Sequence, residues 1–271
     1  MLEHSCLFVP GDRPERFDKA LNAGADMVIL DLEDSVPAGR KTMAREAAAR
    51  WLSGDRPVFV RINGVETGEF DEDVAALAAR PGLAGVVLPK AESRKQVAAL
   101  ASRLPGPVRL ILLVESALGV WNVLELASAP RVHRLAFGAI DFQLDTGIAG
   151  AGEELLYARS RLVLASRIAG LLPPLDGVTA SIEDTEALVA DVRRARRLGF
   201  GGKLCIHPRQ VKAVNDGFLP TAEEVAWARS VLQAVSGGSG GAVKHEGRMI
   251  DRPVVERAMR ILEREGGSGG T

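Results

Sequence analysis

Two carboxylates in this sequence follow apolar stretches, and their placement predicts a cation site. Glu115 follows the aliphatic run 110–114, and Asp141 closes the largely apolar stretch 134–140, about one strand–helix unit later. A run with no polar face is typical of a strand that is covered on both sides in a parallel sheet. A carboxylate at the end of such a strand must face water, a cation or a ligand, because an unpaired charge is unstable in a core.

These two acids favour magnesium over other metals. Sites made only of oxygen ligands suit Mg2+, which keeps several waters and needs one or two protein carboxylates. No His/His or Cys/His set with zinc spacing is present. The alternative is a structural role, in which Glu115 and Asp141 pair with Arg61 or Lys90. We predict magnesium ligation.

A second set of polar residues follows the other apolar runs. Arg61 ends the run 58–60, and a guanidinium there can bind a substrate carboxylate in a bidentate manner. A salt bridge from Arg61 to Glu33 or Asp34 is the alternative, and both roles can hold together. Glu33 and Asp34 fit a further ligand or a general base, but we favour orientation of Arg61 and of a metal-bound water.

Lys90 and His207 each allow two interpretations. A lysine in this position could form a Schiff base, as in aldolases that use no metal. Neighbouring carboxylates should keep the pKa of Lys90 high, so we favour an electrostatic role. His207, before Pro208, is either a turn residue or a ligand contact, and the sequence leaves the two open.

The elements that carry these residues follow a strand-then-helix rhythm. Eight such units in a row predict an α/β fold, a (β/α)8 TIM barrel, whose reactive groups gather at the carboxyl ends of the strands. No Gly-x-Gly-x-x-Gly follows the first strand, which argues against a dinucleotide-binding sheet. The expected strands are 6–9, 27–33, 58–63, 85–90, 110–114, 134–141, 175–178 and 203–207.

The rhythm stops near residue 220, which predicts three segments. Residues 1–220 form the barrel, and 221–265 form a C-terminal helical extension with helices near 221–234 and 253–264. The Gly/Ser stretch 236–241 within this extension has the composition of a flexible linker. We expect 266–271 to be a disordered tail.

Composition narrows the class of protein further. The 34 Lys and Arg residues balance 35 Asp and Glu residues, which gives no bulk attraction to nucleic acid or to a membrane surface. No apolar run is long enough to span a bilayer, and the N-terminus lacks a signal-peptide pattern. Cys6 and Cys205 lie in apolar runs and are interpreted as buried free thiols. We expect a soluble, cytoplasmic protein.

Seven motifs occur in order and resemble one known family. The set is similar to the citrate lyase β-subunit (CitE-like) and malyl-CoA lyase family of the HpcH/HpaI aldolase superfamily, and the resemblance covers roughly residues 5–265. Any one motif alone would be weak, but the ordered set is specific. The motifs are SCLFVPG (5–11), DLEDSV (31–36), VRIN (60–63), LPKAE (88–92), VES (114–116), FGAID (137–141) and CIHP (205–208).

The resemblance implies a Mg2+-dependent carbon–carbon lyase. Such an enzyme cleaves a 3-hydroxyacyl thioester, such as citryl-CoA or malyl-CoA, by a retro-Claisen reaction into an acyl-CoA and a 2-oxo acid, oxaloacetate or glyoxylate. It implies that Glu115 and Asp141 hold Mg2+ and that Arg61 binds the oxo acid. It also implies a homo-oligomer, a trimer or larger, and a CoA or acyl-carrier channel lined by Phe8, Pro10, Arg13, Arg16, Lys19, Ile206, His207 and Pro208.

Two other functions remain open at this point. The same enolate chemistry followed by attack of water would make the chain a (3S)-malyl-CoA thioesterase. The chain could instead be a β subunit that works only within a citrate lyase complex, on a thioester of an acyl-carrier protein. A stand-alone lyase is the leading hypothesis, and these two functions are its alternatives.

Overall fold

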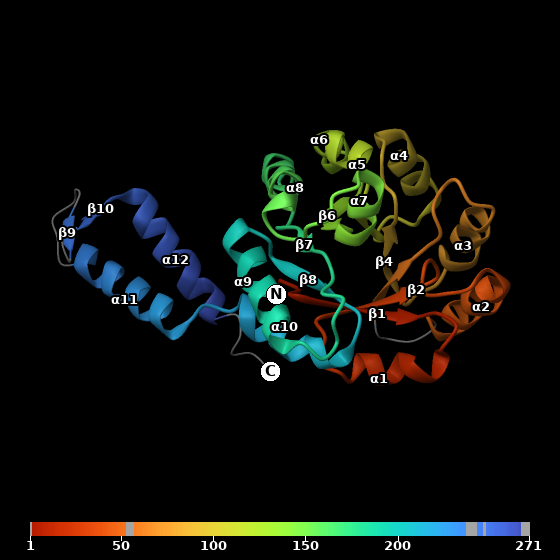
Figure 1. The fold of residues 1–271 in the computed structure, drawn as a ribbon, viewed down its shortest axis with the longest axis horizontal. Coiled ribbons are helices and arrows are strands. Elements are labelled where there is room, and N and C mark those ends of the chain that lie inside the picture. The colour runs from red at the N-terminus through yellow and green to blue at the C-terminus, as the bar shows by residue number, and fades with distance from the viewer. Residues whose placement is uncertain (1, 53–56, 237–242, 246–247, 267–271) are drawn as a thin grey trace. The chain divides into compact units, whose positions relative to one another are not determined.

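The computed structural model describes residues 2–52, 57–236, 243–245 and 248–266, and its first unit is a closed barrel (Figure 1). Eight parallel strands pair in chain order, and β1 closes the ring by pairing with β8. The predicted (β/α)8 fold is thus confirmed. The strands are β1 (Ser5–Pro10), β2 (Met27–Asp31), β3 (Val58–Arg61), β4 (Leu83–Leu88), β5 (Arg109–Val114), β6 (Val132–Phe137), β7 (Leu175–Asp176) and β8 (Gly202–Cys205).

Helices connect these strands, as parallel pairing requires. Most are amphipathic and turn an alanine- and leucine-rich face to the strands. The helices of this unit are α1 (Phe17–Leu21), α2 (Lys41–Trp51), α3 (Glu69–Leu77), α4 (Arg94–Arg103), α5 (Ala117–Trp121), α6 (Val123–Ala127), α7 (Ala139–Thr146), α8 (Leu156–Ile168), α9 (Thr185–Leu198) and α10 (Pro208–Phe218), with 3-10 turns η1 (Pro14–Arg16), η2 (Ala38–Arg40) and η3 (Glu153–Leu155).

The barrel interior is a packed apolar core. Side chains alternate inward and outward along each strand, so every second residue fills the centre. The inward set consists of Cys6, Met27, Ile29, Phe59, Val87, Ile111, Leu113, Ala136, Leu175 and Leu204. Both cysteines are free and buried, as predicted. The core fixes the strand ends, which carry the polar residues.

One sequence-based expectation about the elements was wrong. The expected strand 134–141 ends at Phe137, and Asp141 belongs instead to the first turn of α7. After β8, Pro208 begins α10, an eleven-residue helix. Proline suits the first position of a helix because its missing N–H would have no intrahelical partner there.

The chain divides into two compact units, Leu2–Asn215 and a second that runs from Asp216, so the boundary falls within the last turn of α10. The second unit contains α11 (Ala222–Ser236), the strands β9 (Val243–His245) and β10 (Arg248–Ile250), and α12 (Arg252–Gly266). Its two helices pack around Ala228, Val231 and Ala258. Ser236 and Gly266 end helices, while the rest of the predicted linker, 237–241, and of the predicted tail, 267–271, lie outside the described residues.

No helix in the described part of the chain is both long and apolar enough to cross a bilayer.

Candidate functional site

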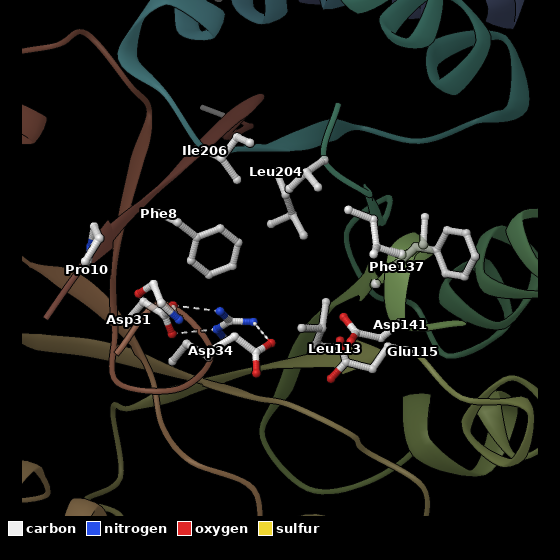
Figure 2. A pocket seen from close by; sticks show the side chains of 16 residues that line it. Phe8, Pro10, Asp31, Asp34, Leu113, Glu115, Phe137, Asp141, Leu204 and Ile206 are labelled. Atoms are coloured by element: carbon white, nitrogen blue, oxygen red, sulfur yellow. Dashed lines mark hydrogen bonds and ion pairs between the residues drawn. The ribbon is translucent and has the colours of Figure 1, made fainter. Parts of the chain in front are cut away.

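A pocket of about 440 Å³ opens at the carboxyl ends of the barrel strands (Figure 2). Side chains from seven strands or the loops that follow them reach it, which is where barrels of this class carry their chemistry. Its wall has a charged part and an apolar part. The charged part consists of Asp31, Asp34, Arg61, Glu115 and Asp141, and the apolar part consists of Phe8, Pro10, Leu113, Phe137, Ala139, Ile140, Val178, Leu204 and Ile206.

Arg61 is held in one orientation by Asp31. The two residues are paired in the β2–β3 register, and Nε and Nη2 of Arg61 each donate a 2.7 Å hydrogen bond to one carboxylate oxygen of Asp31. Asp31 is 1% exposed, and the ring of Phe8 covers the guanidinium at 4.7 Å. Burial opposes charge on Asp31, but these bonds to Arg61 hold its pKa below the ordinary value. The guanidinium is therefore a fixed positive charge at the pocket.

The remaining nitrogen of Arg61, Nη1, meets two further carboxylates. Glu33 Oε2 lies at 3.0 Å and Asp34 Oδ2 at 3.6 Å. Both salt bridges that were considered for Arg61 from the sequence, to Glu33 and to Asp34, are therefore present. Asp31, which takes two bonds to Arg61, was not among the predicted site residues. The sequence predicted a bidentate contact between Arg61 and a substrate carboxylate. On its Nε–Nη2 edge, Arg61 makes such a contact with Asp31 of the protein itself.

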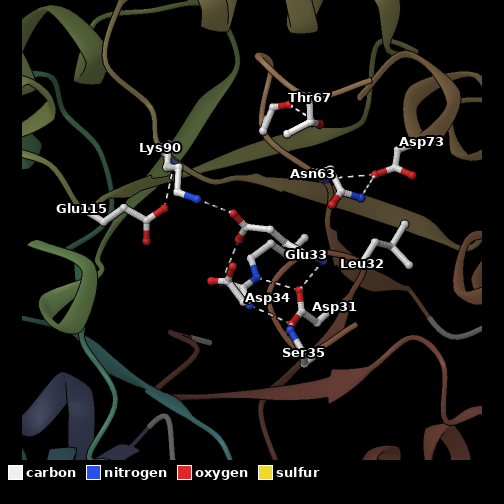
Figure 3. Close-up of polar contacts among 12 residues, drawn as sticks. Asp31, Leu32, Glu33, Asp34, Ser35, Asn63, Thr67, Asp73, Lys90 and Glu115 are labelled. Carbon is white, nitrogen blue, oxygen red and sulfur yellow. Dashed lines mark hydrogen bonds and ion pairs between the residues drawn. The ribbon is translucent and has the colours of Figure 1, made fainter. Parts of the chain in front are cut away.

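Lys90 connects this cluster to Glu115 (Figure 3). Its ammonium lies 3.3 Å from Glu33 Oε1, and its backbone N–H donates a 2.7 Å hydrogen bond to Glu115 Oε1. The backbone of Lys90 has a φ of 48°, in the left-handed region that few non-glycine residues adopt. Partial burial lowers the pKa of Lys90, but Glu33, and then Asp34 and Glu115, raise it above its ordinary value. Lys90 is therefore protonated, as an electrostatic role requires.

Glu115 follows the last residue of β5 and is 3% exposed. Burial raises the pKa of Glu115 to about 8, and the negative charges of Glu33 and Asp141 add to the rise, against the opposing bond from Lys90. A buried carboxyl among other carboxyls is unstable as an anion unless a cation joins it. This environment fits a bound divalent cation.

Asp141 reaches the same pocket from α7, and Figure 2 shows its carboxylate beside that of Glu115. Gly138 lies between them in the chain, and a Cβ at this position would contact the Cβ and Oε2 of Glu115. The glycine therefore allows α7 to begin close to the carboxylate. Among the described residues, no group of three or more His, Cys, Asp or Glu side chains gathers as a metal site. Two carboxylates with water and a substrate oxygen match the way proteins bind Mg2+.

The loop after Arg61 is fixed by a separate charge cluster. The backbone N–H and the side-chain amide of Asn63 both donate to Asp73 Oδ2, at 2.9 and 2.7 Å (Figure 3). Asp73 in turn accepts a 2.7 Å bond from Arg45, which also pairs with Glu69 and Glu72. This cluster keeps the end of β3 in place.

The residues expected in a CoA channel divide into two groups. Phe8, Pro10 and Ile206 line the pocket. Arg13, Arg16 and Lys19 are exposed on η1, α1 and the turn before them, and they do not belong to the described pocket wall. His207 is half-buried and accepts a 3.2 Å bond from the Arg209 N–H, and Pro208 begins α10. His207 thus occupies the turn that was one of its two interpretations.

Comparisons with known proteins identify the family of this chain. The family model for HpcH/HpaI aldolase/citrate lyase matches residues 4–208. A citrate lyase subunit beta-like protein of Deinococcus radiodurans is 38% identical over 97% of this chain and 98% of its own. An L-malyl-CoA/beta-methylmalyl-CoA lyase of Cereibacter sphaeroides is 34% identical over 94% of this chain and 92% of its own.

Solved structures give the same relationship. The crystal structure of CitE from Mycobacterium tuberculosis in complex with magnesium, acetoacetate and coenzyme A has a TM-score of 0.87 and 38% identity, and the match covers 98% of each chain. A citrate lyase beta subunit from the same organism, complexed with oxaloacetate and magnesium, has a TM-score of 0.70 and 37% identity over 81% of this chain and 98% of the other. The chain therefore belongs to the HpcH/HpaI aldolase/citrate lyase family, as its ordered motifs predicted, and it is a carbon–carbon lyase.

Proposed function

We propose that this protein is a Mg2+-dependent lyase that cleaves a 3-hydroxyacyl-CoA thioester of the citryl-CoA or malyl-CoA type into an acyl-CoA and a 2-oxo acid. One observation carries the proposal. A single pocket joins a guanidinium fixed by Asp31 with the two carboxylates Glu115 and Asp141. Two solved structures of relatives support the same substrate class. One is a complex with magnesium, acetoacetate and coenzyme A, and the other is a complex with oxaloacetate and magnesium.

Glu115 and Asp141 would hold the cation. Their donor atoms are oxygens, as Mg2+ prefers, and the raised pKa of Glu115 shows that its anion needs a positive neighbour. When bound, Mg2+ would lower the pKa of the substrate hydroxyl and stabilise the oxygen that becomes the ketone.

Arg61 would bind the carboxylate of the oxo-acid part. As the bond between the two carbons breaks, the hydroxyl loses its proton, and the bonding electrons move to the carbon next to the thioester, whose enolate then takes up a proton. The guanidinium of Arg61 is already oriented by Asp31, so it would hold this carboxylate without reorganising during the reaction. Glu33, anchored to Lys90, would keep Arg61 in this orientation.

The apolar wall would take the acyl part of the substrate. Phe8, Phe137, Val178 and Ile206 supply apolar surface to the pocket wall. Excluding water there strengthens the charge interactions and protects the enolate from side reactions. We extend the proposal to a CoA channel that passes the basic residues Arg13, Arg16 and Lys19. We also propose that the protein is cytoplasmic and homo-oligomeric, and that each chain has a barrel domain and a C-terminal helical domain.

Product analysis tests the proposed reaction. Purified protein with MgCl2 and malyl-CoA should release glyoxylate, and with citryl-CoA it should release oxaloacetate. Free CoA with intact malate would instead indicate a thioesterase, and turnover that appears only with an acyl-carrier protein thioester would indicate a complex subunit. Glu115→Gln and Asp141→Asn should each lower turnover by at least about 100-fold, on the scale of lost electrostatic stabilisation. Unchanged turnover in both variants would refute the site.

A further inference from the structure

The guanidinium of Arg61 uses most of its N–H groups for contacts within the protein and turns only one end to the pocket. Asp31 occupies Nε and Nη2 with two 2.7 Å bonds. The carboxylate of Asp31 also accepts the backbone N–H groups of Glu33 at 2.9 Å and Ser35 at 3.1 Å. This carboxylate is therefore fully engaged and 1% exposed, so the edge of Arg61 that it covers is closed to a ligand. A substrate carboxylate must approach the end that carries Nη1.

Two side chains already share that end, and they differ in exposure. Glu33 has 8% of its side chain exposed and is held between Arg61 and Lys90. Asp34 has 56% of its side chain exposed, lies 3.6 Å from Nη1 and lines the pocket. The amides on either side of Asp34 are fixed by Asp31, so its backbone is held while its side chain faces the pocket (Figure 3).

The balance of charges around Arg61 changes when an anion enters the pocket. Asp31, Glu33 and Asp34 surround one guanidinium, and Lys90 adds a second positive charge. The cluster thus carries one excess negative charge before any ligand binds, and a substrate carboxylate would raise the excess to two. Releasing one protein carboxylate to solvent restores the balance.

Resting on the function proposed above, we propose that Asp34 is an exchangeable counter-ion of Arg61, which the carboxylate of the oxo acid displaces when it binds. Asp34 has the geometry for exchange, because it lies 3.6 Å from Nη1 of Arg61 and more than half of its side chain is exposed, so its carboxylate can return to water at low cost. Asp31 and Glu33 are buried and cannot leave at comparable cost. In the free protein the carboxylate of Asp34 balances the positive charge of Arg61. Because an incoming anion must displace this carboxylate, Asp34 sets how tightly the anion is held.

The variant Asp34→Asn tests this exchange. The asparagine keeps the size of the side chain and removes the charge that competes with the ligand. Titration calorimetry with pyruvate and MgCl2 should show binding that is about two- to fivefold tighter in the variant than in the wild type, the range expected for an exposed pair. Pyruvamide, which replaces the carboxylate with a neutral amide, should show no such gain.

Two further variants make the result specific. Asp71→Asn removes an exposed aspartate that pairs with Arg103 outside the pocket, and it should leave pyruvate affinity unchanged. Asp31→Asn should weaken pyruvate binding, since it releases the edge that orients Arg61. A gain in affinity at Asp34 is not expected of a residue that only supports the fold.

The outcomes separate this inference from the proposed function. If the wild type binds pyruvate and Asp34→Asn binds it equally or more weakly, the exchange is refuted while the lyase proposal stands. The exchange is also refuted if pyruvamide gains as much as pyruvate. If wild-type protein with MgCl2 binds no 2-oxo acid at all, both proposals fail.

Discussion

Asp31 and Arg61 are paired in two ways. Their backbones lie in register on the neighbouring strands β2 and β3, and their side chains form an ion pair with two hydrogen bonds at the carboxyl end of the barrel. Their backbones are paired by the sheet, so the side chains meet without the entropy cost of ordering a loop. The orientation of the guanidinium is therefore a property of the barrel itself. The substrate meets a charge that is already in place.

Removing the Asp31 charge should destabilise the protein strongly. Asp31→Asn leaves a buried guanidinium without its two-bonded partner, and breaking a buried pair in this way costs about 3–5 kcal/mol. Chemical denaturation should show this loss in the free energy of unfolding. Asp71→Asn, at an exposed pair, is the control and should change stability by no more than about 0.5 kcal/mol. A comparable small change for Asp31→Asn would contradict the assigned role.

The stability of the metal-free protein should fall as pH rises. The pKa of Glu115 is about 8 in the folded protein, against an ordinary value of 4.5, so folding favours its protonated form. Its contribution is complete below pH 4.5 and is lost as pH rises through 8, at about 1.4 kcal/mol for each unit of difference. Thermal melts in EDTA should therefore show a wild-type decline over this range that is smaller in Glu115→Gln, in which only the raised pKa of Glu33 remains.

Magnesium should reverse this decline and release a proton. At pH 7 the Glu115 carboxyl is largely protonated, and a bound cation requires its anion. Calorimetry in two buffers of different ionisation enthalpy should thus detect proton release on Mg2+ binding, and affinity should increase from pH 6 to pH 8. Affinity that is independent of pH, with no proton released, would mean that Glu115 is not a ligand.

Alanine at position 138 should disturb the two carboxylates together. The new Cβ would contact the Cβ and Oε2 of Glu115, so either this side chain or α7 must move. We expect a loss of about 1–3 kcal/mol in stability, as for other overpacked sites, and at least tenfold weaker Mg2+ binding. Gly39→Ala, where an added Cβ meets open space, should preserve Mg2+ affinity. Equal affinities in the two variants would count against close packing at Gly138.

Lys90 should not form a Schiff base with the oxo acid. Its pKa is raised chiefly by Glu33, so the amine is protonated and is not a nucleophile near neutral pH. Treatment with pyruvate and sodium borohydride should therefore leave both the mass and the activity of the protein unchanged. A mass increase that disappears in Lys90→Gly would overturn this view. Glycine is the suitable variant because it adopts the left-handed φ of position 90 without strain.

Much of this architecture could be predicted because buried strands leave a strong pattern. The aliphatic run of β5, bounded by Arg109 and Glu115, has the length and composition of a covered strand. Repetition of that pattern predicted the barrel, and the barrel brought Arg61, Glu115 and their neighbours to one end. The ordered motifs then added the family.

The features that the sequence did not reveal depend on local geometry. The stretch 134–141 is apolar almost throughout, and no side chain caps α7 at Gly138, so strand and helix could not be told apart there. Asp31 was missed because it lies inside the strand pattern, and its role depends on register with Arg61. Asp31 ends an apolar run, and a second acidic residue, Glu33, follows two positions later. This pattern is the signal that could have identified Asp31.

The two carboxylates proposed for magnesium are mounted on different kinds of element. Glu115 directly follows β5, a strand hydrogen-bonded to neighbours on both sides, whereas Asp141 lies in the first turn of α7, an eight-residue helix. We therefore expect ions of other radii, such as Mn2+ or Ca2+, to be accommodated by small displacements of that helix, while the barrel stays as it is. Discrimination between metals would then be adjustable through the helix alone, without redesigning the sheet.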